Sequence, residues 1–403
     1  MAAQRGAIPG FWAFRLGRGR SDRPPPPATA LARRTAIWLH ATEAEAVPVL
    51  TLLARQIREI RGAPPTLLTG TEADPGPADS VAALTAHLER HDPALLVLSG
   101  APLPPALVET ARRRELPILL VDARRPVLPG QWGLWPGFLR GLLGAMTEIH
   151  AADSASATLL RGLAPGHVPV EASGPFARYP PAPPCNASEL EAMRATLAHR
   201  LCWFAWSLPA PEEAAALLAH EQALRRSHRL LLIVSPREAG RGAELAEAAR
   251  DVGFVSARRA LDEEITETTQ VYIADAEDEP GLFLRLAGIC YLGGSLTREA
   301  ETAPPLLAAA LGSVLVFGPH AAAGDRALLD RLRKGRAARR VANAGELGDA
   351  IATLLAPEIG AEAALRAWSI ATEGSDATYA LARRICDRAH DIAHARAATG
   401  GVG

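Results

Sequence analysis

Residues 94–122 read ALLVLSGAPLPPALVETARRRELPILLVD, and this stretch predicts the fold class of the chain. Apolar runs of five or six residues stand at each end, Ala94–Ser99 and Pro117–Asp122. The segment Pro105–Arg114 between them has helical periodicity, with apolar residues recurring every three or four positions. Two short buried strands joined by an amphipathic helix are typical of a parallel sheet with crossover helices.

The same alternation extends in both directions from this unit. In the first half we expect strands at 36–40, 66–69, 148–152 and 168–172, and helices at 43–61 and 80–90. In the second half we expect strands at 202–207, 230–235, 252–258, 270–275, 289–293, 314–318 and 340–342, and helices at 212–226, 242–251, 304–311 and 346–355.

Two proline-rich stretches divide the pattern, since consecutive prolines cannot continue a helix. One is Arg23–Pro27 and the other Pro175–Cys185. We therefore expect a leader and linker at 1–33, a first Rossmann-like domain at 34–175, a linker at 176–195, a second such domain at 196–357 and a helical tail at 358–403. Two doubly wound α/β domains would place a ligand in a cleft between them, at the carboxyl ends of the strands.

Composition narrows the functional classes. The chain has 403 residues and a formal net charge of −1, which provides no basic field for nucleic acid. The four cysteines are far apart and have no metal-ligand spacing, so we expect neither a metal site nor a disulfide framework, and a cytoplasmic protein. No apolar run is long enough to span a bilayer. The aromatic and basic stretch 11–20 could rest on an anionic membrane surface or be an unstructured leader.

Several strings, in chain order, resemble motifs of the bacterial Kdo (3-deoxy-D-manno-octulosonic acid) transferases. In the first half, Ile37–Ala41 followed by Glu45 resembles W-[IL]-H-A-x-S-V-G-E, and Ile118–Arg124 resembles P-V-L-L-V-N-A-R. In the second half the matching strings are Trp203–Ser207 with Glu212 and Glu213, Ser235–Arg237 with Arg241, Asp275 with Glu279, Leu292–Leu296, and Leu311–His320.

The resemblance implies a GT-B glycosyltransferase of two Rossmann-like domains facing a cleft. It further implies inverting, single-displacement transfer of Kdo from CMP-Kdo to a lipid A precursor in lipopolysaccharide biosynthesis, at the cytoplasmic face of the inner membrane and without a cofactor. The general base of such a family member corresponds here to Glu45, with Glu43 as its nearest competitor. Both could instead simply begin a helix, where acidic residues are favoured.

The resemblance also assigns nucleotide-sugar-binding residues: Arg237, Glu279, Gly293, Gly294, Ser295, Gly318, Pro319 and His320, with Ser207, Arg124 and Arg241 as further candidates. A single donor phosphate can be held by backbone N–H groups and arginines without a metal. Each residue also has an ordinary explanation: a turn for the glycines, a salt bridge for the arginines, a helix cap for Glu279 and a structural role for His320. We expect Trp203 and Trp206 in the core.

Other family motifs are absent. The family's V-E-T-E-L-W-P corresponds to Ser99–Pro105 here, without either carboxylate, and G-G-H-N-P-L-E-P corresponds to Glu301–Ala308. Pro209 and Glu238 replace two family histidines. Two alternatives therefore stay open: a catalytically degenerate GT-B paralogue that binds a partner, and a transferase with a different sugar donor.

Overall fold

The computed structural model of the chain describes residues 36–127, 137–198, 200–276, 279–298 and 301–400. These residues form two compact units. The N-terminal unit contains the described residues up to Tyr179 together with those from Glu373 onward, and the C-terminal unit contains Pro180–Thr372. The aromatic and basic stretch 11–20 lies outside the described residues.

The N-terminal unit has one parallel sheet, as predicted. Its strands lie in the order β2-β1-β3-β4-β5-β6. The strand bounds are β1 Ile37–Ala41, β2 Thr66–Thr69, β3 Leu95–Ser99, β4 Ile118–Ala123, β5 Glu148–Ala151 and β6 Val170–Ala172. The helices are α3 Val47–Glu59, α4 Val81–His91, α5 Pro105–Arg113, α6 Phe138–Gly144 and α7 Ser154–Leu163.

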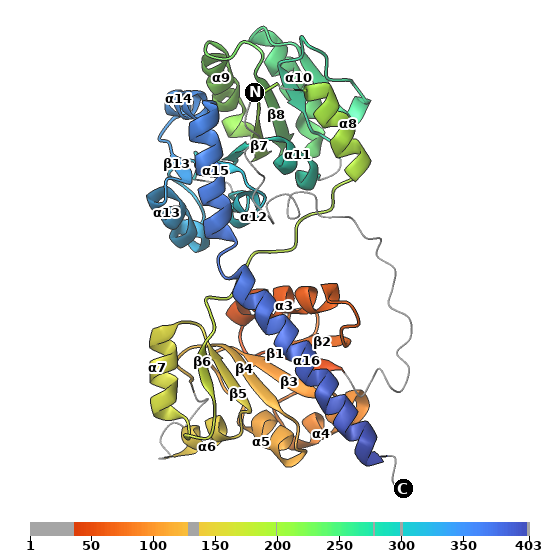
Figure 1. The fold of residues 1–403 in the computed structure, drawn as a ribbon. Helices are drawn as coiled ribbons and strands as arrows, with labels where there is room; N and C mark the ends of the chain where they lie inside the picture. The colour runs from red at the N-terminus through yellow and green to blue at the C-terminus, as the bar shows by residue number, and fades with distance from the viewer. Residues whose placement is uncertain (1–35, 128–136, 199, 277–278, 299–300, 401–403) are drawn as a thin grey trace, which may run out of the picture. The chain divides into compact units, whose positions relative to one another are not determined.

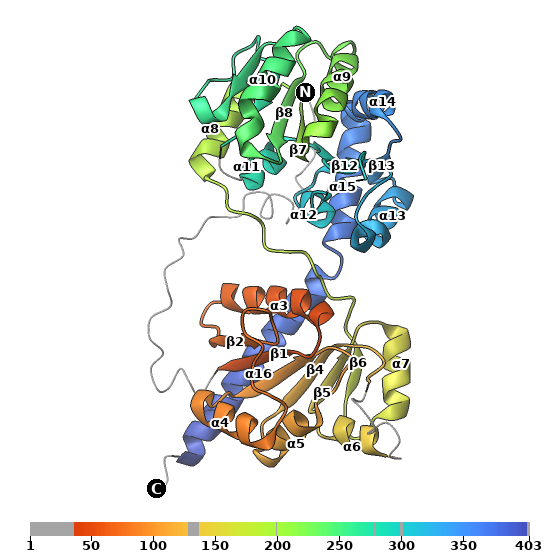
Figure 2. The same cartoon turned by 180° about the vertical axis from the view of Figure 1, so that it is seen from behind.

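Each face of this sheet has its own apolar core, because successive strand residues point to opposite faces. Trp38 lies on the face that α4, α5, α6 and α7 cover, whereas Ile37 and Leu39 lie on the face that α3 covers. The C-terminal helix α16, Ser375–Gly400, also packs on the α3 face through Leu381, Ile385 and Cys386. It crosses in front of the sheet in Figure 1 and behind it in Figure 2.

The C-terminal unit has a second all-parallel sheet, in the order β13-β12-β11-β7-β8-β10-β9. The strand bounds are β7 Cys202–Leu208, β8 Leu231–Pro236, β9 Ser256–Arg258, β10 Val271–Ile273, β11 Ile289–Leu292, β12 Val314–Phe317 and β13 Ala338–Arg340. The helices are α8 Ala187–Leu197, α9 Ala210–Leu224, α10 Gly242–Asp251, α11 Pro280–Leu286, α12 Pro305–Ala310, α13 Arg326–Lys334, α14 Ala344–Leu354 and α15 Pro357–Ala371.

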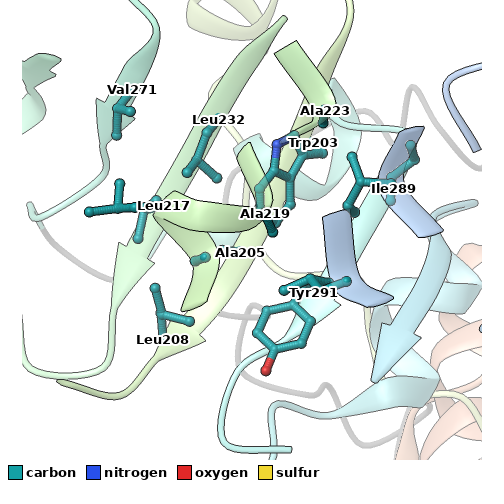
Figure 3. Packing of buried hydrophobic residues seen from close by; sticks show 14 of the residues in the cluster. Trp203, Ala205, Leu208, Leu217, Ala219, Ala223, Leu232, Val271, Ile289 and Tyr291 are labelled. Atoms are coloured by element: carbon teal, nitrogen blue, oxygen red, sulfur yellow. The ribbon is translucent and has the colours of Figure 1, made fainter. Parts of the chain in front are cut away.

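Strand β7 is the middle strand of this sheet and contributes to its core. Trp203 is fully buried beside Ala219 and Ala223 of α9 and Ile289 of β11, as Figure 3 shows. Trp203 Nε1 donates a hydrogen bond to Nδ1 of the buried His220 at 3.2 Å. Trp206 is also buried, so both tryptophans lie in the core as predicted.

Three of the differences between the predicted and the observed elements have an evident local cause. Strand β9 is shorter than 252–258 because Gly253, with φ +88°, ends α10 just before it. Strand β13 lies two residues earlier than 340–342 because it is an edge strand, whose exposed Arg339 and Arg340 interrupt the apolar pattern. The tail is two helices, and Gly374, with φ +84°, lies between them.

None of the helices in the described part of the chain combines the length and hydropathy that crossing a bilayer requires.

Candidate functional site

The N-terminal sheet changes winding direction between β1 and β3, which is where open α/β sheets bind ligands. A cavity of about 960 Å³ lies at the carboxyl ends of β1, β2 and β3. Its polar lining includes His40, Thr42, Glu43, Thr71, Glu72 and Asp79. Cavity size and position both suit a small organic ligand.

A hydrogen-bonded relay orients His40 at this cavity. Trp38 Nε1 donates to Thr69 Oγ1 at 2.9 Å, and the same hydroxyl lies 2.8 Å from His40 Nδ1. Thr69 Oγ1 accepts from Trp38 and can donate its own proton to His40 Nδ1; in that tautomer the imidazole proton is on Nε2. Burial lowers the pKa of His40, and the carboxylates of Asp79 and Asp74 oppose this. A neutral imidazole can therefore offer an N–H donor to a ligand.

The two carboxylates considered as base occupy different positions after β1. Glu43 lines the cavity, and its Oε1 accepts a hydrogen bond from the backbone N–H of Ala101 at 2.7 Å. Glu45 lies two residues later, within the 3₁₀ turn Ala44–Ala46, and is exposed. Its backbone carbonyl, rather than its side chain, accepts from Arg178 at 2.8 Å. The structure thus brings Glu43, but not Glu45, to the cavity lining.

Arg124, which follows β4, does not line this cavity. Its guanidinium lies 3.8 Å from the carboxylates of Asp122 and Asp153, and its side chain is 57% exposed. Asp122 is buried and also pairs with Arg178; burial raises the pKa of its carboxyl group.

In the C-terminal sheet the winding changes between β7 and β11, and several predicted residues meet there. Ser207, the penultimate residue of β7, lies at a register shift with φ +53°, a strained conformation for a residue with a side chain. Gly293 follows β11, and a Cβ at this glycine would lie 2.3 Å from the carbonyl oxygen of Ser207. The close approach of the two strand ends therefore requires glycine at this position.

Arg237, which follows β8, joins these strand ends. Its Nε donates to Ser207 Oγ at 3.3 Å. Its Nη2 donates to the carbonyl oxygens of Ser207 at 3.3 Å, Gly293 at 3.4 Å and Glu301. Within the described residues, Nη1 has no hydrogen-bond partner, which leaves one side of the guanidinium for a ligand.

Glu212 is the residue that orders the loop after β11, and the sequence motif did not identify it as a site residue. It is 1% exposed. Its Oε1 accepts from the backbone N–H groups of Leu296 at 2.8 Å and Thr297 at 2.9 Å, and from Thr297 Oγ1 at 3.0 Å. Its Oε2 accepts from the N–H of Gly294 at 2.8 Å and from Tyr291 Oη at 2.7 Å. Burial, followed by the Glu212 charge, raises the pKa of Tyr291.

Ser295 ties this loop to the one after β12. Its Oγ donates to the Leu292 carbonyl at 2.6 Å and accepts from the N–H of Gly318 at 2.7 Å. Its own carbonyl accepts from the N–H of His320 at 2.8 Å. Ser295 is fully buried, so its role is to hold Gly318, Pro319 and His320 beside the β11 loop.

The two remaining predicted residues pair with protein charges. Arg241 forms a two-pronged ion pair with Glu213 at 2.9 and 3.0 Å and a second with Glu244 at 2.7 Å. Glu279 precedes α11 at the N-cap position without a side-chain cap bond, and it pairs with Arg259. Among the described residues, no group of three His, Cys, Asp or Glu side chains could hold a metal ion.

Residues 12–176 match the family model described as 3-deoxy-D-manno-octulosonic-acid transferase (kdotransferase). A curated relative, the 3-deoxy-D-manno-octulosonic acid transferase of Haemophilus influenzae, is 30% identical over 121 residues. That alignment covers 30% of this chain and only 28% of the relative.

Two solved structures resemble the fold. The C-terminal CMP-Kdo binding domain of WaaA from Acinetobacter baumannii is 26% identical, with a TM-score of 0.42, over 45% of this chain and 96% of that one. MurG from the same organism is 12% identical, with a TM-score of 0.43, over 87% of this chain and 98% of that one. Because these TM-scores are low, the assignment depends on the N-terminal match. By that match, residues 12–176 of the chain are similar to the 3-deoxy-D-manno-octulosonic-acid transferase family.

Proposed function

We propose that this protein is a glycosyltransferase that moves Kdo from CMP-Kdo to a lipid A precursor by inverting single displacement, at the cytoplasmic face of the inner membrane. The observation that carries the proposal is the carboxylate-lined cavity at the β1/β3 switch point, inside the unit that the family model covers. An acceptor hydroxyl entering this cavity would meet Glu43 and the His40 imidazole.

Inverting transfer needs one general base to remove the proton of the acceptor hydroxyl. We assign this role to the turn after β1. Glu45 is the candidate that corresponds to the family motif, whereas Glu43 is the candidate supported by the cavity lining. Comparing Glu45→Gln with Glu43→Gln separates them, because only loss of the base should reduce the maximal rate by orders of magnitude.

The donor phosphate would lie at the β7/β11 switch point of the C-terminal unit. Nη1 of Arg237 can donate to a phosphate oxygen there, whereas the N–H groups of Gly293 and Gly294 already donate to the Trp206 carbonyl and to Glu212. The bonds of Ser295 and Glu212 order the loop after β11 beside Arg237, which lowers the entropic cost of binding.

A non-catalytic binding role is favoured by one specific observation. Arg237 already donates to Ser207, Gly293 and Glu301, and Arg241 is held by two carboxylates, so much of their donor capacity is used within the protein. The segment Glu301–Ala308 also lacks the Asn and Glu of the family motif G-G-H-N-P-L-E-P, which by the resemblance hold the CMP moiety. Both observations would suit a GT-B shell that binds a partner. A different sugar donor is a third possibility on the same grounds.

Calorimetric titration of CMP and CMP-Kdo into the full-length protein tests the proposal, followed by an assay of Kdo transfer to a lipid A precursor. We expect saturable binding that Arg237→Ala removes, and transfer that one of the two Glu→Gln variants abolishes. Arg112→Ala, which changes an exposed arginine of the N-terminal unit, is the matched control. Binding without transfer would favour the non-catalytic shell, and absence of both would reject the proposal.

A further inference from the structure

A second cavity, of about 750 Å³, lies along the free edge of the C-terminal sheet. It is bounded by α13, edge strand β13, residues near both ends of α14, helix α15 and Pro319 of the loop after β12. Its volume is that of a pocket for a small organic molecule.

Arginines from three elements line this cavity. Arg333 belongs to α13, Arg336 to the following turn, Arg339 and Arg340 to β13, and Arg366 to α15. Five arginines against two lining glutamates leave a local charge of +3, in a chain whose overall charge is −1. A concave surface of one charge sign concentrates counter-ions.

The two glutamates do not neutralise the β13 arginines. Glu346 Oε2 accepts from the backbone N–H of Ala342 at 2.7 Å, and Glu362 pairs with Arg366 at 2.5 Å. Arg333 lies 3.5 Å from Asp330. Within the part of the chain that the structure describes, Arg336, Arg339 and Arg340 have no ion-pair partner. Three of the arginines that line the cavity are therefore not neutralised by a protein carboxylate in that part of the chain.

The cavity also has an apolar lining. Ala338, Val341, Leu354 and Ala363 all contribute to it and are buried. Charges on an edge strand can protect against aggregation, and basic residues at the end of α13 suit the helix dipole. Neither of these two effects explains why the arginines surround a cavity with an apolar lining. Neither explains why Arg366 of α15 belongs to the group.

We propose that this cavity binds an organic phosphate with more than one anionic group, its phosphates held by Arg336, Arg339 and Arg340. Guanidinium groups bind phosphate oxygens in a two-pronged geometry, and the apolar lining accommodates the carbon skeleton. The ligand could be a soluble polyphosphate or the phosphates of a lipid headgroup, which share this chemistry. The site does not depend on sugar transfer.

The test uses inositol hexakisphosphate as the soluble probe, in calorimetric titrations of the full-length protein at low and at high salt. We expect 1:1 binding that salt weakens. The double variant Arg339→Gln/Arg340→Gln should lose about tenfold or more in affinity, because two charge-assisted contacts disappear. Arg225→Gln/Arg226→Gln, an exposed pair on the same unit, should bind like the unaltered protein.

Vesicles of phosphatidylcholine with and without phosphatidylglycerol distinguish the two sources of phosphate. Sedimentation only with the anionic vesicles, lost in Arg339→Gln/Arg340→Gln but not in the control pair, would identify a lipid headgroup. The variant Arg339→Lys/Arg340→Lys retains both positive charges and should bind with intermediate affinity. Such binding would show that the loss in the double-Gln variant is not caused by misfolding.

Binding of neither probe, or binding equal in the two double-Gln variants, would overturn the proposal. Competition between CMP and inositol hexakisphosphate for one site would also overturn it, because the cavity would then be part of the donor site. We expect Arg339→Gln/Arg340→Gln to leave CMP binding intact. This proposal and the proposed transferase function can therefore fail independently of each other.

Discussion

The buried carboxylate of Glu212 offers the sharpest test of how the donor loop is held. In Glu212→Gln, the amide oxygen can take the place of Oε1 and keep the three donors from Leu296 and Thr297. The amide nitrogen then occupies the Oε2 position, where it faces the N–H of Gly294. Two donors cannot bond to each other, so the Gly294 N–H is left buried without an acceptor.

The magnitude follows from these contacts. An unsatisfied buried donor costs about 1–3 kcal/mol, and the remaining bonds weaken once their acceptor is neutral. We therefore expect Glu212→Gln to lower the free energy of unfolding of the C-terminal unit by about 2–4 kcal/mol. Glu221→Gln is the matched control on the same helix: it removes an exposed ion pair at 3.3 Å and should cost about 0.5 kcal/mol or less.

Denaturant unfolding measures the stability change, and hydrogen exchange of the Gly294, Leu296 and Thr297 amides measures the local effect. Exchange at these amides should accelerate in Glu212→Gln and remain unchanged in Glu221→Gln. Equal stability of the two variants, with protected loop amides in both, would refute the view that Glu212 holds the loop.

Three further outcomes are expected. Gly293→Ala should destabilise the C-terminal unit and weaken any CMP binding, because its methyl group would lie 2.3 Å from the Ser207 carbonyl; unchanged thermal unfolding would contradict this. Ile385→Ala should cost the N-terminal unit about 2–5 kcal/mol in denaturant unfolding, since the fully buried side chain joins α16 to its core. Burial lowers the pKa of His220 to about 3, so protons bind the unfolded state first. The contribution of His220 to the free energy of unfolding of the C-terminal unit should therefore be complete above pH 6.5. It should fall by about 1.4 kcal/mol per pH unit between pH 6.5 and pH 3. Melting curves recorded across this pH range should show a smaller slope for His220→Gln.

The candidate site was only partly predictable from the sequence. Arg237, Gly293 and Ser295 were identified by the resemblance to family motifs, and they do meet at the end of the C-terminal sheet. Glu212 was noted only as part of a motif. Its role in holding the loop after β11 was not predicted, because acidic residues are common at the start of helices. The two carboxylates after β1 were not separable, because a shift of two residues in a 3₁₀ turn decides which one faces the cavity.

The sequence by itself determined the fold class and the two sheets. Short apolar runs alternating with amphipathic helices can be buried only as parallel strands with crossovers, and this pattern is local. Only the tertiary structure decided the strand order, the packing of α16 on the N-terminal sheet and the meeting of five arginines beside β13. These features depend on contacts between residues far apart in the chain, and single-sequence periodicity contains no information about which distant segments pack together.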